Sequence, residues 1–308
     1  MSCAHLGRAH LARVAAICAL AAGCSSGSSP VAPSPDLATA PIVVGGGDLG
    51  VGPRSCDERV RAGALARLTL LAVSTPADDT DLAVDASGRT LAFLSGGALM
   101  LAPIDAADPH TVGPASVVTI GGGLTLAGGS FTGDGAYWFA ASTGGSSQIY
   151  RATLSGNTAT VGVAHFPATN CAAGALASPL FAAADETREL FVVAPLTGCA
   201  GGSWIVSGAL DRHLGAFAAA IASPGWRAPS LVPGDLTLVV STTTTPATLA
   251  VATRGATDVQ FGPARPLMLA VGDVDDRQLA VDPTCKVAYL VSRRDGGRGG
   301  YDLWVADL

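Results

Sequence analysis

The chain has 308 residues, of which 49% are hydrophobic, and it contains 39 glycines and 19 prolines. Only 14% of the residues are charged, so the composition excludes a bundle of long helices and favours many short strands joined by turns. The formal net charge is −6 and the chain has no extended basic cluster, which argues against nucleic acid as a partner because phosphate binding depends on clustered Lys and Arg.

Residues 1–23 resemble a bacterial lipoprotein signal peptide. A mildly basic start precedes an apolar run, residues 14–22, that is too short to span a bilayer. The small residues that follow end in Cys24, although Ala21 stands where such motifs usually have leucine. We expect cleavage before Cys24 and attachment of diacylglycerol to its sulfur; the alternative is an ordinary secretory signal with a chance cysteine.

Removal of the signal would leave 16 basic and 24 acidic residues, because Arg8 and Arg13 are lost, and the formal charge becomes −8. Residues 24–55 are rich in Ser, Pro, Gly and Ala and have no sustained apolar period, so we expect a flexible tether. Residues 56–308 would then form the folded domain. Ser25 is not the aspartate that retains some lipoproteins, so the expected location is the cell envelope, at the outer membrane facing the periplasm or the cell surface.

A repeat of about 50 residues runs through the folded part. It is marked by turns near Asp85, Thr132, Ala184, Val232 and Asp282. A strand follows each turn, at residues 90–94, 136–140, 189–193, 236–240 and 287–291. A third strand follows each of these, at residues 99–104, 148–154, 203–210, 248–253 and 301–307. Fourth, outer strands are visible at residues 116–120 and 266–270. The period is that of a four-stranded propeller blade, so the sequence predicts an all-β propeller.

The two ends of the repeat region complement each other. The fifth repeat stops at Leu308 after its third strand, whereas residues 64–72 form a strand with no partner before the first repeat. We predict that residues 64–72 complete the last blade and so close the ring without an open edge. The count gives five blades, with six as the alternative if a degenerate blade lies within residues 156–227.

The last residues also carry a resemblance. Ser292–Leu308, SRRDGGRGGYDLWVADL, resembles the WD-like propeller repeat of the TolB-like superfamily. The match departs at the turn, which is Asp282-Pro283-Thr284-Cys285 here in place of a Ser-Pro-Asp-Gly type. It covers the first and last repeats well and the middle ones poorly. The resemblance implies a propeller used mostly for binding and scaffolding, and it implies no catalytic residue.

Four cysteines remain after Cys24, an even number that suggests two disulfides in an exported chain. Cys171 precedes the first strand of the third blade and Cys199 lies in its second hairpin, positions on one face of a propeller. Cys285 lies in the first turn of the last blade, and Cys56 just before the closing strand, on the opposite face. We therefore predict the pairs Cys171–Cys199 and Cys56–Cys285, the second acting as a clasp on the ring.

The residues that could carry chemistry have structural interpretations. The acidic residues Asp78, Asp79, Asp81 and Asp85 could bind calcium, but turn capping explains them better. The glycines of residues 296–300 lie in a hairpin and lack the features of a phosphate loop. No nucleophile elbow or metal-binding histidine pair occurs, and the histidines of the mature chain are scattered at His110, His165 and His213. We expect no catalytic residue, metal or cofactor.

The candidate binding residues are Arg293, Arg294 and Arg298, the densest positive patch of an acidic chain, and Trp226 in a loop-like stretch. The first interpretation is a lipid-anchored scaffold without catalysis that binds an envelope protein or a small ligand through the face carrying these arginines. The alternative is a propeller hydrolase or lyase that acts on envelope or extracellular glycans or peptides. A third possibility is a spacer with no specific surface.

Overall fold

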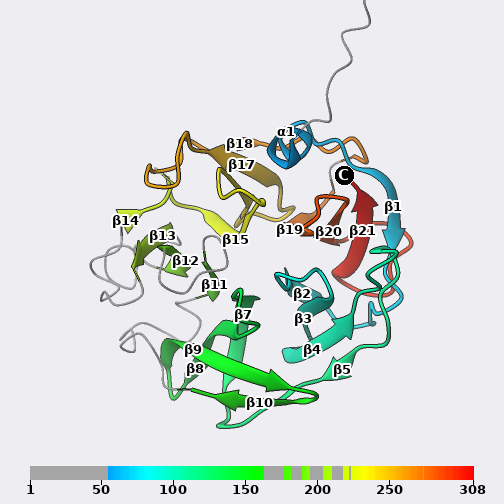
Figure 1. Cartoon of the computed structure of the whole chain (residues 1–308), viewed down its shortest axis with the longest axis vertical. Coiled ribbons are helices and arrows are strands. Elements are labelled where there is room, and N and C mark those ends of the chain that lie inside the picture. The colour runs from blue at the N-terminus through cyan, green and yellow to red at the C-terminus, as the bar shows by residue number, and fades with distance from the viewer. Residues whose placement is uncertain are drawn as a thin grey trace, which may run out of the picture. The chain divides into compact units, whose positions relative to one another are not determined.

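The computed structural model describes residues 55–162, 177–181, 189–194, 204–209, 218–221, 223–272 and 274–308. Cys24, Cys171, Cys199, His165 and His213 lie outside these residues. Within them, five sheets surround one axis as the blades of a β-propeller (Figure 1), which confirms the predicted fold class and five blades. No helix of the described part is long and apolar enough to cross a bilayer.

The five sheets follow one another along the chain, each beginning with its innermost strand. The first blade contains β2 (Asp79–Val84), β3 (Thr90–Ser95), β4 (Ala98–Pro103) and β5 (Ser116–Val117). The second contains β7 (Thr125–Phe131), β8 (Tyr137–Thr143), β9 (Ser146–Ser155), β10 (Thr158–Val161) and, at its edge, β6 (Thr119–Ile120). The third contains β11 (Ala177–Phe181), β12 (Glu189–Ala194), β13 (Trp204–Ala209) and β14 (Ala218–Ala219). The fourth contains β15 (Trp226–Leu231), β16 (Thr237–Thr242), β17 (Leu249–Thr253) and β18 (Arg265–Pro266). The fifth contains β19 (Asp276–Val281), β20 (Val287–Ser292), β21 (Asp302–Asp307) and β1 (Ala66–Leu70).

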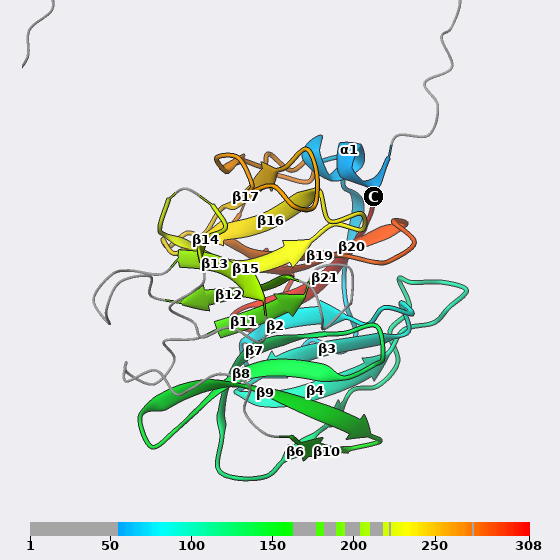
Figure 2. The ribbon, with the colours of Figure 1, turned by 60° about the vertical axis from the view of Figure 1, so that its left-hand side comes forward.

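The innermost strands β2, β7, β11, β15 and β19 contact one another in a closed cycle. In Figure 2 they gather at the middle of the propeller, whereas β6 and β10 lie at its rim.

The turns after the innermost strands, such as residues 282–285, lie on one side of the ring, which we call the turn face. The hairpins between second and third strands, such as residues 293–301, lie on the other side, the hairpin face.

Aspartate side chains cap the turns on the turn face. The Asp85 carboxylate accepts hydrogen bonds from the backbone N–H groups of Arg89 (2.7 Å) and Thr90 (2.9 Å). Asp282 does the same for Lys286 and Val287, at 2.7 and 2.8 Å. These bonds satisfy N–H groups at the turn, which is why aspartate recurs there.

The ring closes as predicted, because β1 pairs antiparallel with β21 and supplies the outer strand of the fifth blade. A short helix that the sequence analysis did not anticipate, α1 (Cys56–Arg61), precedes β1. It begins with a capping box in which Ser55 and Glu58 bind each other's backbone N–H groups. Arg59 of α1 donates to the carbonyl oxygen of Leu308 at 2.9 Å, so the helix contacts the last residue of the sequence.

The outer strand predicted at residues 116–120 is wrong as one element. Residues 116–117 pair with β4 as β5, whereas residues 119–120 form β6 and pair in parallel with β10 of the second blade. The chain therefore passes from one blade to the next at Val118, whose side chain is buried.

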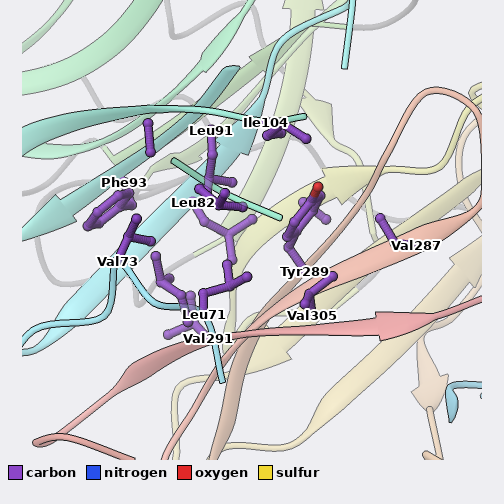
Figure 3. Packing of buried hydrophobic residues seen from close by; sticks show 14 of the residues in the cluster. Leu71, Val73, Leu82, Leu91, Phe93, Ile104, Val287, Tyr289, Val291 and Val305 are labelled. Atoms are coloured by element: carbon purple, nitrogen blue, oxygen red, sulfur yellow. The ribbon is translucent and has the colours of Figure 1, made fainter. Parts of the chain in front are cut away.

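The junction between the first and fifth blades has the largest hydrophobic cluster of the described residues. In Figure 3, Leu82 and Phe93 of the first blade meet Tyr289 and Val291 of the fifth, and Leu71 joins them from the segment after β1. Burying a large apolar side chain stabilises a fold by about 1.5–3 kcal/mol. The closing segment therefore contributes to the core as well as to strand pairing.

Candidate active site at the mouth of the central channel

Two hollows lie between the innermost strands. The first, about 150 Å³ in volume, is lined chiefly by Thr80, Asp81, Arg227, Ala228, Arg277 and Gln278. The second, about 90 Å³, lies between all five innermost strands and shares Asp81 and Gln278 with the first. We call the first hollow the channel mouth. It collects side chains from blades one, four and five, which are far apart in the sequence.

Strand irregularities decide which side chains reach the channel mouth. The pairing of β2 with β3 shifts register between Thr80 and Ala83, and Asp81 has a left-handed φ of 53°. The pairing of β15 with β16 shifts at the equivalent place, where Ala228 has a φ of 48°. Such β-bulges redirect side chains and are common next to active sites. Asp81 therefore lies at a point where the innermost strand bends.

The guanidinium groups of Arg227 and Arg277 provide the positive charge of the channel mouth. Burial lowers the pKa of Arg227, and the nearby charge of Arg277 lowers it further, against smaller opposing effects of Tyr301, Asp275 and Asp81. Within the described part of the chain, nothing accepts a hydrogen bond from the buried Nε and Nη2 of Arg227 or from Nε of Arg277. Both arginines thus have donors to offer to a ligand.

Tyr301 holds Arg277 in place. The Cζ atom of Arg277 lies 3.7 Å from the centre of the Tyr301 ring, which is a close cation–π contact. The Tyr301 hydroxyl donates to Asp275 Oδ2 at 2.5 Å, and its backbone N–H donates to Asp78 Oδ1 at 2.9 Å. A Cβ atom at Gly300 would overlap the Asp78 carboxylate, so glycine at this position leaves room for the hydrogen bond from the Tyr301 N–H to Asp78. The ring is therefore fixed at both its hydroxyl and its backbone.

Asp275 supports Tyr301 as an ionised carboxylate. It also accepts a hydrogen bond from the backbone N–H of Ala247 at 2.7 Å. Burial would raise the pKa of Asp275, but the hydrogen bonds from Tyr301 and Ala247 and the charges of Arg277 and Arg293 together hold it below its ordinary value. The negative charge of Asp275 is thus maintained beside the channel mouth at neutral pH.

Asp81 is the carboxylate that lines both hollows. Its Oδ2 accepts a hydrogen bond from the Thr80 hydroxyl at 3.1 Å. Burial raises the pKa of Tyr137, and the negative charge of Asp81 raises it further. The Tyr137 hydroxyl is buried against Gly129, a channel-lining residue where a Cβ atom would overlap the tyrosine ring. Asp81 therefore lies close to a buried tyrosine and, in the channel mouth, shares the lining with Arg227 and Arg277.

Of the predicted binding residues, Arg293 is the one beside the channel mouth. Its Cζ lies 4.4 Å from the centre of the Tyr301 ring and its Nη2 lies 3.9 Å from Asp78 Oδ1. Arg294 pairs with the buried Asp276 at 2.8 Å and binds backbone carbonyl groups. Arg298 binds the carbonyl oxygens of residues 72 and 74. Arg294 and Arg298 therefore hold loop backbone in place, whereas Arg293 lies over the Tyr301 ring.

Trp226 and the cysteines have structural contacts. The Trp226 indole donates to the Ser223 hydroxyl at 3.0 Å, and Trp226 packs on the core cluster between the third and fourth blades. The sulfur atoms of Cys56 and Cys285 form a disulfide that joins α1 to the turn face of the fifth blade. The predicted pair Cys171–Cys199 lies outside the described residues. Among described residues, no group of three His, Cys, Asp or Glu side chains is placed to hold a metal ion.

Comparison with known proteins yields a likeness in fold. No protein-family model matches the sequence. No curated protein matches it either. A gluconolactonase from Xanthomonas campestris matches with a TM-score of 0.51 and 12% identity, over 83% of this chain and 93% of that one. A luciferin-regenerating enzyme matches with a TM-score of 0.48 and 8% identity, over 79% of this chain and 95% of that one. A candidate TolB protein from Agrobacterium tumefaciens matches with a TM-score of 0.43 and 14% identity, over 76% and 84%.

The match to a gluconolactonase overturns the prediction of a non-catalytic scaffold. That prediction took the propeller resemblance as evidence for binding alone, whereas the fold is here shared with an enzyme over most of both chains. Fold and chemistry are separable, so function must be argued from the site. The channel mouth is the place where this propeller gathers groups that could act on a substrate.

Arg227 and Arg277 were not among the residues predicted from the sequence, and Asp81 was expected to cap a turn. Thr80, Arg227 and Arg277 each lie four residues before the last residue of an innermost strand, so they occupy equivalent positions around the axis. Superposing the repeats on their turns would have placed the two arginines together. The sequence thus indicated the site only through equivalent positions in different repeats, and no short motif includes these residues together.

Proposed function

We propose that the chain is a propeller hydrolase that cleaves a carboxylic ester or lactone at the channel mouth. The observation that carries the proposal is that the Asp81 carboxylate lines the same hollow as the guanidinium groups of Arg227 and Arg277. A base beside fixed positive charge suits hydrolysis at a carbonyl carbon. The fold shared with a gluconolactonase makes a lactone the first substrate to test.

In this proposal Asp81 acts as the general base. It takes a proton from a water molecule whose oxygen attacks the carbonyl carbon, and the electron pair of the C=O π bond moves to the carbonyl oxygen. Arg277, held by Tyr301, stabilises the negative charge on that oxygen. The tetrahedral intermediate then breaks its bond to the alkoxide oxygen, which takes the proton from Asp81. The products are an alcohol and a carboxylic acid, and Asp81 is regenerated.

The test is hydrolysis of a panel of lactones and acyl esters by the purified chain and by Asp81→Asn. We expect kcat/KM to fall by about 10²–10⁴ in the variant, the usual contribution of a general base. Asparagine accepts a left-handed φ as aspartate does, so the backbone at residue 81 should be kept. Asp258→Asn, an equal charge change on an exposed loop, is the control and should leave the rate unchanged. Equal rates for Asp81→Asn and the wild type, or no hydrolysis of the panel by the wild type, would contradict the proposal.

We also propose that the hydrolase is exported and held in the cell envelope by a lipid on Cys24, after removal of residues 1–23, with residues 24–55 as its tether. The support is the sequence pattern that ends in Cys24. Cys24→Ser should move the protein from the outer-membrane fraction to the soluble fraction and abolish labelling by a radioactive fatty acid. Unchanged fractionation and labelling of this variant would refute the anchor.

A further inference from the structure

One edge of Arg227 is shaped for a carboxylate. Its Nε and Nη2 atoms are buried, and no described residue accepts a hydrogen bond from either. In the planar guanidinium group, the Nε–H and one Nη2–H point in the same direction. This edge matches the two oxygens of a carboxylate through parallel hydrogen bonds. A buried donor of a charged group is costly without an acceptor, so the edge indicates a ligand of this geometry.

The charges around Arg227 favour the same ligand. Arg277 lines the same hollow, and its Nε also lacks an acceptor among the described residues. Asp81 is the carboxylate in the lining of this hollow, so the two guanidinium groups leave it with a net positive charge. Asp275 acts on Arg227 and Arg277 through its charge, but its two oxygens accept hydrogen bonds from Tyr301 and Ala247 and not from these guanidinium groups. An anion between the two guanidinium groups would relieve their repulsion.

The size of the channel mouth limits the ligand. Its volume of about 150 Å³ is below the range of roughly 300–1,000 Å³ that is usual for small-molecule sites. Polar side chains from three blades line it together with Ala228 and Val291, and Gln278 is fixed by two hydrogen bonds to the backbone of Leu82. The hollow therefore suits a small hydroxylated acid rather than an apolar or polymeric ligand.

We propose that Arg227 binds the carboxylate of a small organic acid at the channel mouth and that the substrate of the hydrolase is itself such an anion. The second part of this inference rests on the proposed hydrolase, whereas the binding site does not. Arg227 holds the carboxylate, and Arg277 stays available for the carbonyl oxygen of the bond that is cleaved.

The test measures binding apart from hydrolysis, with gluconate as the probe and sorbitol as its uncharged counterpart. Calorimetric titration at low salt should detect gluconate and at least tenfold weaker binding of sorbitol. Arg227→Gln should weaken gluconate binding by about 10- to 100-fold, the effect of losing a charged pair of hydrogen bonds. Arg227→Lys should also weaken it, because lysine keeps the charge without the planar edge. Arg265→Gln removes the same charge from an exposed residue of the same blade and should change nothing.

Equal binding of gluconate and sorbitol, tighter binding of inorganic phosphate than of gluconate, or unchanged affinity in Arg227→Gln would overturn the inference. If Arg227→Gln does not fold, the wild type gives the answer by modification with phenylglyoxal and mass spectrometry. Gluconate should then protect Arg227 and sorbitol should not, and equal protection by both would count against the site.

The two proposals fail in different ways. Asp81→Asn should lose hydrolysis and still bind gluconate. If Asp81→Asn hydrolyses esters like the wild type while gluconate binding depends on Arg227, the hydrolase mechanism falls and the anion site stands. If hydrolysis depends on Asp81 but gluconate binding does not depend on Arg227, the anion site falls instead.

Discussion

Breaking the Cys56–Cys285 disulfide should reveal how much the ring closure contributes to stability. The two cysteines are 229 residues apart, and the chain-entropy relation for a loop of that size gives about 5 kcal/mol at 25 °C. This figure treats the unfolded chain as free of structure, so it is the upper end of the expected effect. For a protein of this size, about 5 kcal/mol corresponds to a fall in Tm of roughly 10–20 °C.

The two cysteines are not equivalent, which allows a sharper test. Cys285 has a left-handed φ of 57°, at the turn position where the first and second blades have Gly88 and Gly135. A residue with a Cβ atom costs about 1–2 kcal/mol in that conformation. Cys56→Ala and Cys285→Gly both remove the disulfide, but Cys285→Gly also removes this strain. We therefore expect Cys285→Gly to destabilise the protein by about 1 kcal/mol less than Cys56→Ala.

The measurement is urea unfolding of the wild type and both variants, monitored by tryptophan fluorescence. The dependence of the free energy of unfolding on urea concentration should be the same in all three proteins. A loss below about 2 kcal/mol in Cys56→Ala would refute the entropic argument, since that is the low end for a disulfide. Equal or greater destabilisation by Cys285→Gly would refute the argument from backbone strain.

Two further predictions concern the site. Gln278→Ala removes both hydrogen bonds to the buried backbone of Leu82, so the free energy of unfolding should fall by about 2–4 kcal/mol in urea titrations, and a loss below 1 kcal/mol would contradict that role. The pKa of Asp275 is lower in the folded protein than its ordinary value of 3.8, so its charged form stabilises the fold above that value, and this contribution is lost as pH falls through the folded pKa. Asp275→Asn should therefore be less stable than the wild type at pH 7, with a smaller difference at pH 3; a difference that stays constant or widens in acid would refute the linkage.

The sequence predicted the fold well because each blade repeats the same physical pattern. The second strand of each blade is mostly apolar, as in residues 287–291, and such a run is buried on both of its sides. An aspartate or glycine turn precedes most of these second strands. Closure by β1 followed from counting strands. The helix α1 was missed because it has six residues and buries only Val60, although Ser55 and Glu58 already had capping-box spacing.

The site was much less predictable. Asp81, Arg227 and Arg277 belong to three blades, and each is unremarkable among its neighbours in the sequence. Arg294 and Arg298 attracted attention because they are close together in the sequence, yet the structure uses both to fix loops. The arginines that are close together in the sequence belong to one hairpin. The residues of the candidate site come from different blades and are close together only in space.

The junction of the first and fifth blades links the clasp to the site. Strand β21 pairs with β20 from Asp302 at the hairpin face to Asp307 at the turn face. Its hairpin-face end follows Tyr301, which holds Arg277, whereas Asp307 at the other end pairs with Arg67 of β1 and with His110. Gln278 joins the same junction from β19 to β2. The strand β21, on which β1 closes the ring, therefore directly follows the tyrosine that positions the cation beside Asp81, and the disulfide lies at the blade that supplies Arg277 and Gln278 to the channel mouth.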